Sequence, residues 1–304
     1  MAIVPRVLFL GTGSSFSVPP LLALLSASVE VIGIILPATR AGPSNLPVRE
    51  RRPPLALPML HESAHRDITS VGWKRGIPVL EIGRLSHPDV VRALAGFEPN
   101  FICVACFPRR LPRPILDLPT CGCLNVHPSL LPENRGPAPL FWTFRSGAPC
   151  TGVTIHLMTE ALDEGDIISQ ASQEVPEGIS GEEMDRRCAS VGGRLLVEAV
   201  QGIWLGTATR VPQRPGEGSY QDWPQLGDFE IPVSWSAARA FRFIRGTEEW
   251  TIPPVILAGN ERLLVQCAIG YVETGHLPGP YLSSGGQLHV QFNPGILRVR
   301  ASRE

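Results

Sequence analysis

Short apolar runs, each long enough for one buried strand, recur through the first 127 residues. They span residues 7–11, 29–36, 77–82, 101–107 and 121–127. Segments with helical spacing lie between several of them, at residues 19–25 and 87–97. Strands that are apolar on both faces are typical of parallel sheets covered by helices on both sides. The order therefore predicts an α/β fold with a doubly wound, mostly parallel sheet.

The last of these runs carries polar side chains near its end. Asn125 and His127 are two residues apart, so a strand places both on the same face. Open α/β sheets hold their ligands at the carboxyl ends of their strands. Pro128 and Pro132 then predict a stiff loop that could wall a pocket. Asn and His can hold a developing oxyanion, and Asp163, further along, can orient the imidazole or take a proton.

Three motifs occur in a fixed order. They read N-V-H-P-S-L-L-P-x-x-R-G-x-x-P, T-G-V-T-I-H and L-D-E-G-D-I. Together they resemble the folate-dependent formyltransferases, which share a fold with the 10-formyltetrahydrofolate hydrolases. The resemblance implies a Rossmann-like domain, 10-formyltetrahydrofolate as co-substrate, and catalysis by Asn125, His127 and Asp163 without a metal. A capping Asn and a satisfied core His on a buried strand would explain the first motif alone, but not all three.

The same resemblance implies which residues contact the folate. They are Phe107, Arg109, Leu111, Ser129, Leu130, Leu131, Pro132 and His156. In the family, the loop after the strand at 101–107 offers backbone groups to the pterin ring. Pro108 departs from that pattern because it removes one N–H donor. His156 is implied to line the pocket and not to act as a catalyst.

Arginines gather in the long loop at residues 37–58. They are Arg40, Arg49, Arg51 and Arg52. A solvated surface segment would explain them. So would an anion-binding flap, because methionyl-tRNA formyltransferases carry a basic insertion here that grips the tRNA acceptor arm. We expect these residues, together with Arg135 before the predicted helix at 137–147, to contact the acceptor substrate.

Two patterns suggest zinc, and the context of each argues against it. Residues 61–65 read H-E-S-A-H, but the segment is short and no third ligand follows, so we expect a surface helix. Cys103 and Cys106 lie three apart in a predicted strand and would face opposite sides. We expect both to be small core residues and expect no metal site.

The second half of the chain predicts two further strands, a long helix and a change of architecture. After strands at 151–158 and 166–175, a capping box at Ser180 opens a long amphipathic helix. Gly192 and Gly193 either weaken that helix or let a neighbour approach closely. Residues 207–227 are rich in Gly, Pro and polar side chains and predict a linker.

Short strands separated by Gly and Pro dominate the remainder. They lie at 255–257, 263–272, 287–292 and 296–300, after a helix at 235–245. This spacing predicts a small barrel, and the order resembles the OB-like C-terminal domain of methionyl-tRNA formyltransferases. We therefore assign residues 1–206 to a catalytic domain, 207–227 to a linker and 228–304 to an OB-like barrel domain.

The acceptor amine is less constrained than the donor. The domain order and the Arg-bearing loop favour the amino group of methionyl-initiator tRNA. The net charge is −1, however, and residues 228–304 are nearly balanced, whereas an RNA-binding barrel should show a basic face. Formylation of a small amine, such as an amino sugar or a biosynthetic intermediate, stays open. Hydrolysis of the folate and a non-catalytic folate-binding role are further alternatives.

Composition also bears on location. The first apolar run is broken by Gly11 and Gly13, which predicts a strand and not a signal peptide. No run reaches the length of a membrane span. Seven cysteines, mostly in strand-like runs, favour a reducing cytoplasm. We expect a cytoplasmic enzyme without an obligate protein partner.

Overall fold

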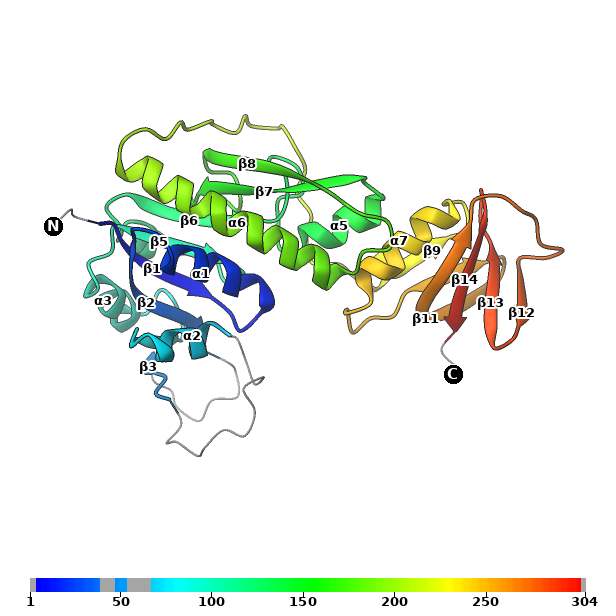
Figure 1. Cartoon of the computed structure of the whole chain (residues 1–304), viewed down its shortest axis with the longest axis horizontal. Coiled ribbons are helices and arrows are strands. Elements are labelled where there is room, and N and C mark those ends of the chain that lie inside the picture. The colour runs from blue at the N-terminus through cyan, green and yellow to red at the C-terminus, as the bar shows by residue number, and fades with distance from the viewer. Residues whose placement is uncertain (1–3, 39–46, 54–66, 302–304) are drawn as a thin grey trace. The chain divides into compact units, whose positions relative to one another are not determined.

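The computed structural model describes residues 4–38, 47–53 and 67–301. Two compact units divide the chain. Unit 1 comprises Met1–Arg135, Gly152–Ser172 and Arg186–Tyr220, and unit 2 comprises Gly136–Thr151, Gln173–Asp185 and Gln221–Glu304. Each unit is built around its own sheet (Figure 1).

An eight-stranded sheet forms the frame of unit 1, in the order β3-β4-β2-β1-β5-β6-β7-β8. The strands are β1 (Arg6–Gly11), β2 (Glu30–Pro37), β3 (Val48–Glu50), β4 (Val79–Ile82), β5 (Phe101–Ala105), β6 (Gly122–His127), β7 (Cys150–Leu157) and β8 (Ile167–Glu174). Consecutive pairs from β4 to β6 are parallel, while β3–β4 and β6–β7 are antiparallel. The prediction of a doubly wound, mostly parallel sheet is confirmed. The short edge strand β3 was not foreseen.

Helices cover this sheet and bury its apolar side chains. They are α1 (Val18–Leu25), α2 (Ile68–Lys74), α3 (Pro88–Ala95), α4 (Arg113–Leu116) and α6 (Gly181–Trp204), with the 3-10 turn η1 (Ser15–Ser17). Alternate residues of β1 point to the same face of the sheet. Leu8 and Leu10 join a core cluster with Val90 and Leu94 of α3. Val90 and Leu94 thus form the buried side of α3, within the helix predicted at residues 87–97.

The paired glycines of α6 mark a close approach. A Cβ atom on Gly192 would overlap Cγ1 of Val126 in β6. One on Gly193 would lie 3.0 Å from Cβ of Ala23 in α1. The helix continues through both residues. The structure therefore supports close packing, and not a weakened helix, as the reason for two glycines here.

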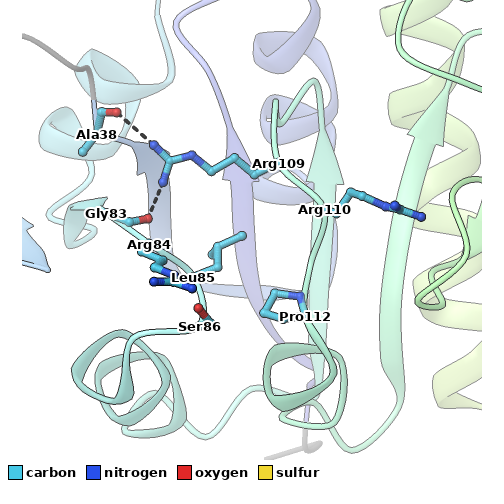
Figure 2. A pocket seen from close by; sticks show the side chains of 8 residues that line it. All are labelled: Ala38, Gly83, Arg84, Leu85, Ser86, Arg109, Arg110 and Pro112. Atoms are coloured by element: carbon cyan, nitrogen blue, oxygen red, sulfur yellow. Dashed lines mark hydrogen bonds between the residues drawn. The ribbon is translucent and has the colours of Figure 1, made fainter. Parts of the chain in front are cut away.

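The carboxyl ends of three neighbouring segments are tied together by Arg109, in the loop after β5. Its guanidinium donates to the carbonyl oxygen of Ala38 at 3.1 Å and to that of Gly83 (Figure 2). Arg110 points away from this junction, as Figure 2 shows. A cavity of about 530 Å³ lies here, lined by Ala38, Gly83, Arg84, Leu85, Ser86, Arg109, Arg110 and Pro112.

Unit 2 contains a six-stranded sheet in the order β12-β13-β14-β11-β10-β9. Its elements are α5 (Pro139–Ser146), η2 (Leu226–Phe229), β9 (Glu230–Pro232), α7 (Ala237–Thr247), β10 (Val255–Ala258), β11 (Glu261–Val272), β12 (Tyr281–Ser284), β13 (Gln287–Gln291) and β14 (Ile296–Ala301). The pairs β12–β13, β13–β14, β14–β11 and β11–β10 are antiparallel, and β10–β9 is parallel. Phe141, Phe229 and Phe243 form an aromatic core with Trp250. The prediction of a second, β-rich fold in the C-terminal part of the chain is confirmed by this sheet, although β9 and β12 were not foreseen. The bounds 228–304 of an OB-like barrel domain stay a prediction.

None of the helices in the described ranges is long and apolar enough to cross a membrane.

The close contact of Gly192 with Val126 predicts the effect of a larger side chain on the free energy of unfolding. Gly→Ala in a helix usually stabilises by roughly 0.5–1 kcal/mol. Gly192→Ala should instead lower the free energy of unfolding by about 1–3 kcal/mol, because Val126 is stiff at χ1 and its strand must shift. Urea titration followed by circular dichroism measures this. Ser190→Ala, on the exposed side of the same helix, is the control; a stabilised Gly192→Ala protein would contradict the contact.

Ionisation of Asp185, in unit 2, lowers the stability of the fold. Asp185 is half-buried, and burial together with Glu249 and Glu182 raises its pKa to about 6. The folded state therefore binds more protons than the unfolded state between about pH 4 and 6, and stability falls as the pH rises through that window.

Asp185→Asn should remove this loss. We expect the variant to exceed the wild type by on the order of 1–2 kcal/mol at pH 7.5, after allowance for solvent screening, with no gain near pH 4. Denaturant titrations at both pH values measure the difference. Glu198→Gln, on an exposed position of the same helix, is the control. An equal gain at both pH values would refute the titration of Asp185 as its source.

Candidate active site

Two antiparallel strands present the polar side chains of the site. In the register of β6 and β7, Asn125 lies opposite His156 and His127 opposite Thr154. All four side chains therefore share one face of this pair. The expected placement of Asn125 and His127 on the same side of their strand is confirmed.

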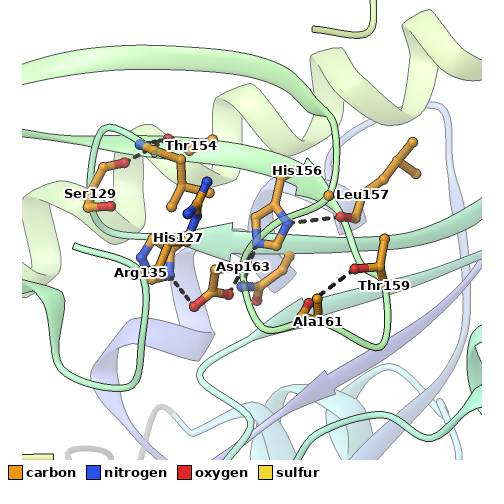
Figure 3. A network of polar contacts seen from close by, with 12 residues as sticks. His127, Ser129, Arg135, Thr154, His156, Leu157, Thr159, Ala161 and Asp163 are labelled. Atoms are coloured by element: carbon orange, nitrogen blue, oxygen red, sulfur yellow. Dashed lines mark hydrogen bonds and ion pairs between the residues drawn. The ribbon is translucent and has the colours of Figure 1, made fainter. Parts of the chain in front are cut away.

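Asp163 reaches this face from the loop after β7. Its Oδ2 atom lies 3.8 Å from Nδ1 of His127, and its Oδ1 atom lies 3.4 Å from Nε2 of His156 (Figure 3). The three side chains are buried. Asp163 has a φ of 57°, in the left-handed region that a non-glycine residue adopts only at a cost. The structure thus brings the three expected catalytic residues together with His156.

Hydrogen bonds determine which groups donate. Nδ1 of His156 lies 2.9 Å from the carbonyl oxygen of Leu157, which can only accept. In the neutral ring, Nε2 then carries the lone pair and accepts from Nδ2 of Asn125 at 3.1 Å. The amide nitrogen of Asn125 bears a second hydrogen. That N–H group can donate to an oxygen atom of a substrate.

His127 follows the same rule. Its Nε2 donates to the carbonyl oxygen of Asn134 at 3.0 Å, so the neutral ring directs the Nδ1 lone pair toward Asp163. Burial lowers the pKa of His127; Asp163 opposes this shift, His156 adds to it, and the bond to Asn134 opposes it. The neutral ring is therefore favoured, which agrees with a role of Asp163 in orienting the imidazole or in taking a proton.

A mobile proton can be held by this cluster. Both imidazole nitrogens that face the carboxylate bear lone pairs when the rings are neutral. One proton on Asp163 or on either ring turns a contact between two acceptors into an attractive one. The cluster can consequently take a proton from a reacting amine and return it, which is general acid–base chemistry.

The loop with the expected folate contacts is held by its backbone. The hydroxyl of Thr154 donates to the carbonyl oxygen of Ser129 at 2.7 Å and accepts from the N–H of Leu131 at 3.1 Å. Gln170 donates to the carbonyl oxygen of Leu131 at 2.7 Å. Ser129 and Leu131 are buried, and Leu130 and Pro132 are half-buried.

Sequence analysis missed the two residues that pin this loop. Thr154 stands in the T-G-V-T-I-H motif, which therefore contained a signal for it. Gln170 stands in a strand that alternates half-buried and exposed residues, where no local pattern singles it out.

Other expected folate contacts lie around the loop after β5. Arg109 lines the cavity described above, whereas Leu111 is buried in the core cluster and Phe107 packs against it. Of the described residues that line the cavity, none belongs to the group of Asn125, His127 and Asp163. Contact of these loop residues with folate stays a prediction.

The arginines expected to meet the acceptor are dispersed. Arg49 lies in β3, which four strands separate from β6, a span of roughly 24 Å. Arg51 pairs with Glu81 at 3.4 Å, and Arg52 pairs with Glu50 at 3.1 Å. Arg40 lies outside the described residues. The structure does not bring Arg49, Arg51 or Arg52 to the cluster of Asn125, His127 and Asp163, and their role in binding stays a prediction.

Arg135 is buried, and its guanidinium is occupied by the protein. It donates to Oε1 of Gln213 at 3.1 and 2.8 Å and to the carbonyl oxygen of Glu217 at 3.1 Å. Gln213 in turn donates to the carbonyl oxygens of Asp163 and Gly165, each at 2.8 Å. Sequence analysis missed Gln213, because its polar, Pro-rich surroundings predict a linker.

The cysteines divide by position. Cys103 and Cys123 are buried, and burial raises the pKa of both thiols, to about 12 for Cys123. The prediction that Cys106 is a core residue was wrong: β5 ends at Ala105, and Cys106 is exposed with a φ of 57°. The H-E-S-A-H segment lies outside the described residues. Within the described residues, no group of three His, Cys, Asp or Glu side chains could hold a metal ion.

Comparison with known proteins agrees with this geometry. Methionyl-tRNA formyltransferase of Pelotomaculum thermopropionicum is 32% identical over 283 residues, which cover 92% of this chain and 84% of the relative. The Bacillus subtilis enzyme of that name is 31% identical over 257 residues, covering 84% and 75%. The structure of WlaRD, a sugar 3N-formyl transferase, shares the fold with a TM-score of 0.69 at 13% identity, each chain being fully covered (100%).

The family model described as formyl transferase matches residues 6–200. That stretch contains all three motifs and every residue of the catalytic cluster. The resemblance seen in the motifs is thus confirmed, and the chain belongs to the formyl transferase family.

Proposed function

We propose that this chain transfers the formyl group of 10-formyltetrahydrofolate to the amino group of methionyl-initiator tRNA. The observation that carries the transfer chemistry is the buried contact of Asp163 with His127 and His156, beside the amide of Asn125. Relatives that are 31–32% identical and are called methionyl-tRNA formyltransferases support the choice of acceptor.

The residues of the cluster divide the reaction between them. The unprotonated amine attacks the formyl carbon, a C–N bond forms, and the formyl oxygen becomes an oxyanion. The second N–H of Asn125 donates to that oxygen, where negative charge develops. Asp163 or neutral His127 takes the proton of the attacking nitrogen, directly or through a water. The proton then passes to N10 of the folate as the old C–N bond breaks.

Two features of unit 1 suit a folate. Thr154 and Gln170 hold the backbone of residues 129–131 in place beside the cluster, so this loop can form a fixed wall against a bound ligand. The cavity of about 530 Å³ lies within the size range of small-molecule sites. Arg84 lines it, and an arginine side chain suits a carboxylate of a folate tail. The guanidinium groups of Arg109 and Arg110 are bonded to backbone carbonyl groups.

Substitution of the catalytic residues tests the assignment. Asn125→Ala, His127→Ala and Asp163→Ala should each reduce formyl transfer by about 100-fold or more, because each removes an oxyanion donor or a proton carrier. Release of tetrahydrofolate measures the rate, and circular dichroism checks folding. Asp117→Ala, which breaks only a surface ion pair with Arg113, is the control. Near-normal activity in any of the three would reject the role of that residue.

The protonation state of His127 gives a second test. Burial holds its pKa below the ordinary value of about 6.5, so the ring should stay neutral as the pH falls through that value. Asp163→Asn removes the carboxylate that opposes the shift, and the pKa of His127 should fall further. NMR titration of the imidazole measures both. A higher pKa in Asp163→Asn would show that the carboxylate does not act on this ring.

The acceptor is tested by supplying the folate with different amines. We expect tetrahydrofolate release with methionyl-tRNA, and the rate should fall as salt rises because RNA binding releases counterions. Release only with amino sugars would indicate a small-amine acceptor. Release without any acceptor would indicate a hydrolase. Both of these outcomes contradict the tRNA assignment.

A further inference from the structure

The segment after α6 is attached to the catalytic loops of unit 1. Val211 pairs with Ile167 through two backbone hydrogen bonds of 2.9 Å. Further along, the hydroxyl of Ser219 accepts from the backbone N–H of Asn134, and the carbonyl oxygen of Ser219 accepts from that of Arg135, each at 2.9 Å. A segment with such bonds on both sides of Gln213 holds that side chain at a defined place.

Gln213 uses both ends of its side-chain amide. The nitrogen donates to the carbonyl oxygens of Asp163 and Gly165, and the oxygen accepts twice from Arg135. The four bonds are 2.8, 2.8, 3.1 and 2.8 Å long. Two donors and two acceptor lone pairs are all that a primary amide offers, so its hydrogen-bonding capacity is filled.

These bonds join the two loops that hold the ring of His127. Asn134, next to Arg135, accepts from Nε2 of His127, while Asp163 faces Nδ1 of the same ring. Gln213 links Arg135 to the backbone of the Asp163 loop. The two partners of the imidazole are therefore connected to each other through a single amide.

The Asp163 loop needs such support. The φ of 57° at Asp163 costs a non-glycine residue on the order of 1 kcal/mol, so contacts with the surrounding residues must stabilise this conformation. Gly165 is pressed against β7, since a Cβ atom there would meet the carbonyl oxygen of Leu157. The bonds from Gln213 fall on residues 163 and 165, on either side of the turn.

We propose that Gln213 is a positioning residue of the active site, which sets the distance between the carboxylate of Asp163 and the imidazole of His127. The inference rests on the proposed formyl transfer for its kinetic test but not for its spectroscopic one. It assigns a role in the site to a residue outside the stretch that matches the family model.

Two variants separate the halves of the amide. Gln213→Glu keeps acceptors for Arg135 but has no N–H group for the carbonyl oxygens of Asp163 and Gly165. Gln213→Met keeps the length and loses both sets of bonds. We expect Gln213→Glu to lower kcat by about 10- to 100-fold with KM values nearly unchanged, because small misplacements of reacting groups reduce rates to this extent. Arg214→Ala, an exposed neighbour, is the control and should keep the wild-type kcat.

NMR titration of His127 provides a readout without substrate. This ring faces Asp163, His156 and the carbonyl group of Asn134. In Gln213→Met, the carboxylate should move away and the pKa of His127 should fall below the wild-type value. An unshifted titration, or a wild-type kcat in Gln213→Glu, would overturn the proposal. A wild-type protein that transfers no formyl group would refute the proposed function, while the titration still decides the role of Gln213.

Discussion

A carboxylate buried between two imidazoles sets the requirements for the rest of unit 1. When both rings are neutral, the nitrogens that His127 and His156 turn toward Asp163 bear lone pairs, and a charge in a protein interior is costly. A proton held on Asp163 or on one of these nitrogens, 3.8 and 3.4 Å away, relieves that cost. Those nitrogens face inward because the opposite nitrogen of each ring is bound to a backbone carbonyl group. The ability of the cluster to exchange a proton therefore originates in two bonds made by the outer sides of the rings.

Mostly uncharged residues fix the positions of the groups around Asp163. The register of β6 against β7 places Asn125 opposite His156, and the hydroxyl of Thr154 ties the next loop to the same strand. Behind the strand, Gly192 allows α6 to lie directly against Val126. Backbone geometry thus determines where the side chains of Asn125, His127 and His156 lie around Asp163.

Local sequence patterns were sufficient to predict the central strands of the first sheet and the shared face of Asn125 and His127. Apolar runs predicted the central strands because both faces of a parallel sheet are buried, and a spacing of two residues put Asn125 and His127 on one face. Patterns of this kind failed where a long-range contact decides the structure. The three-residue strand β3 is too short for periodicity to reveal.

The same limit explains what was missed in the site. Cys106 leaves its strand one residue after Ala105, a bend that no spacing shows. Gln213 bonds to a residue 50 positions away along the chain, within a segment whose composition is that of a solvated linker. The fold and the meeting of Asn125, His127 and Asp163 in one site were therefore predictable, whereas the supports that join distant loops required the coordinates.

The attachment of the segment around Gln213 bears on how the protein matures during synthesis. A nascent chain that has emerged only as far as the end of α6 already carries Asn125, His127 and Asp163, together with every strand of the first sheet. It still lacks the amide that joins the loops on either side of the imidazole. All strands of the sheet are thus synthesised before the residue that links the two loops, and that residue lies beyond the last helix of unit 1.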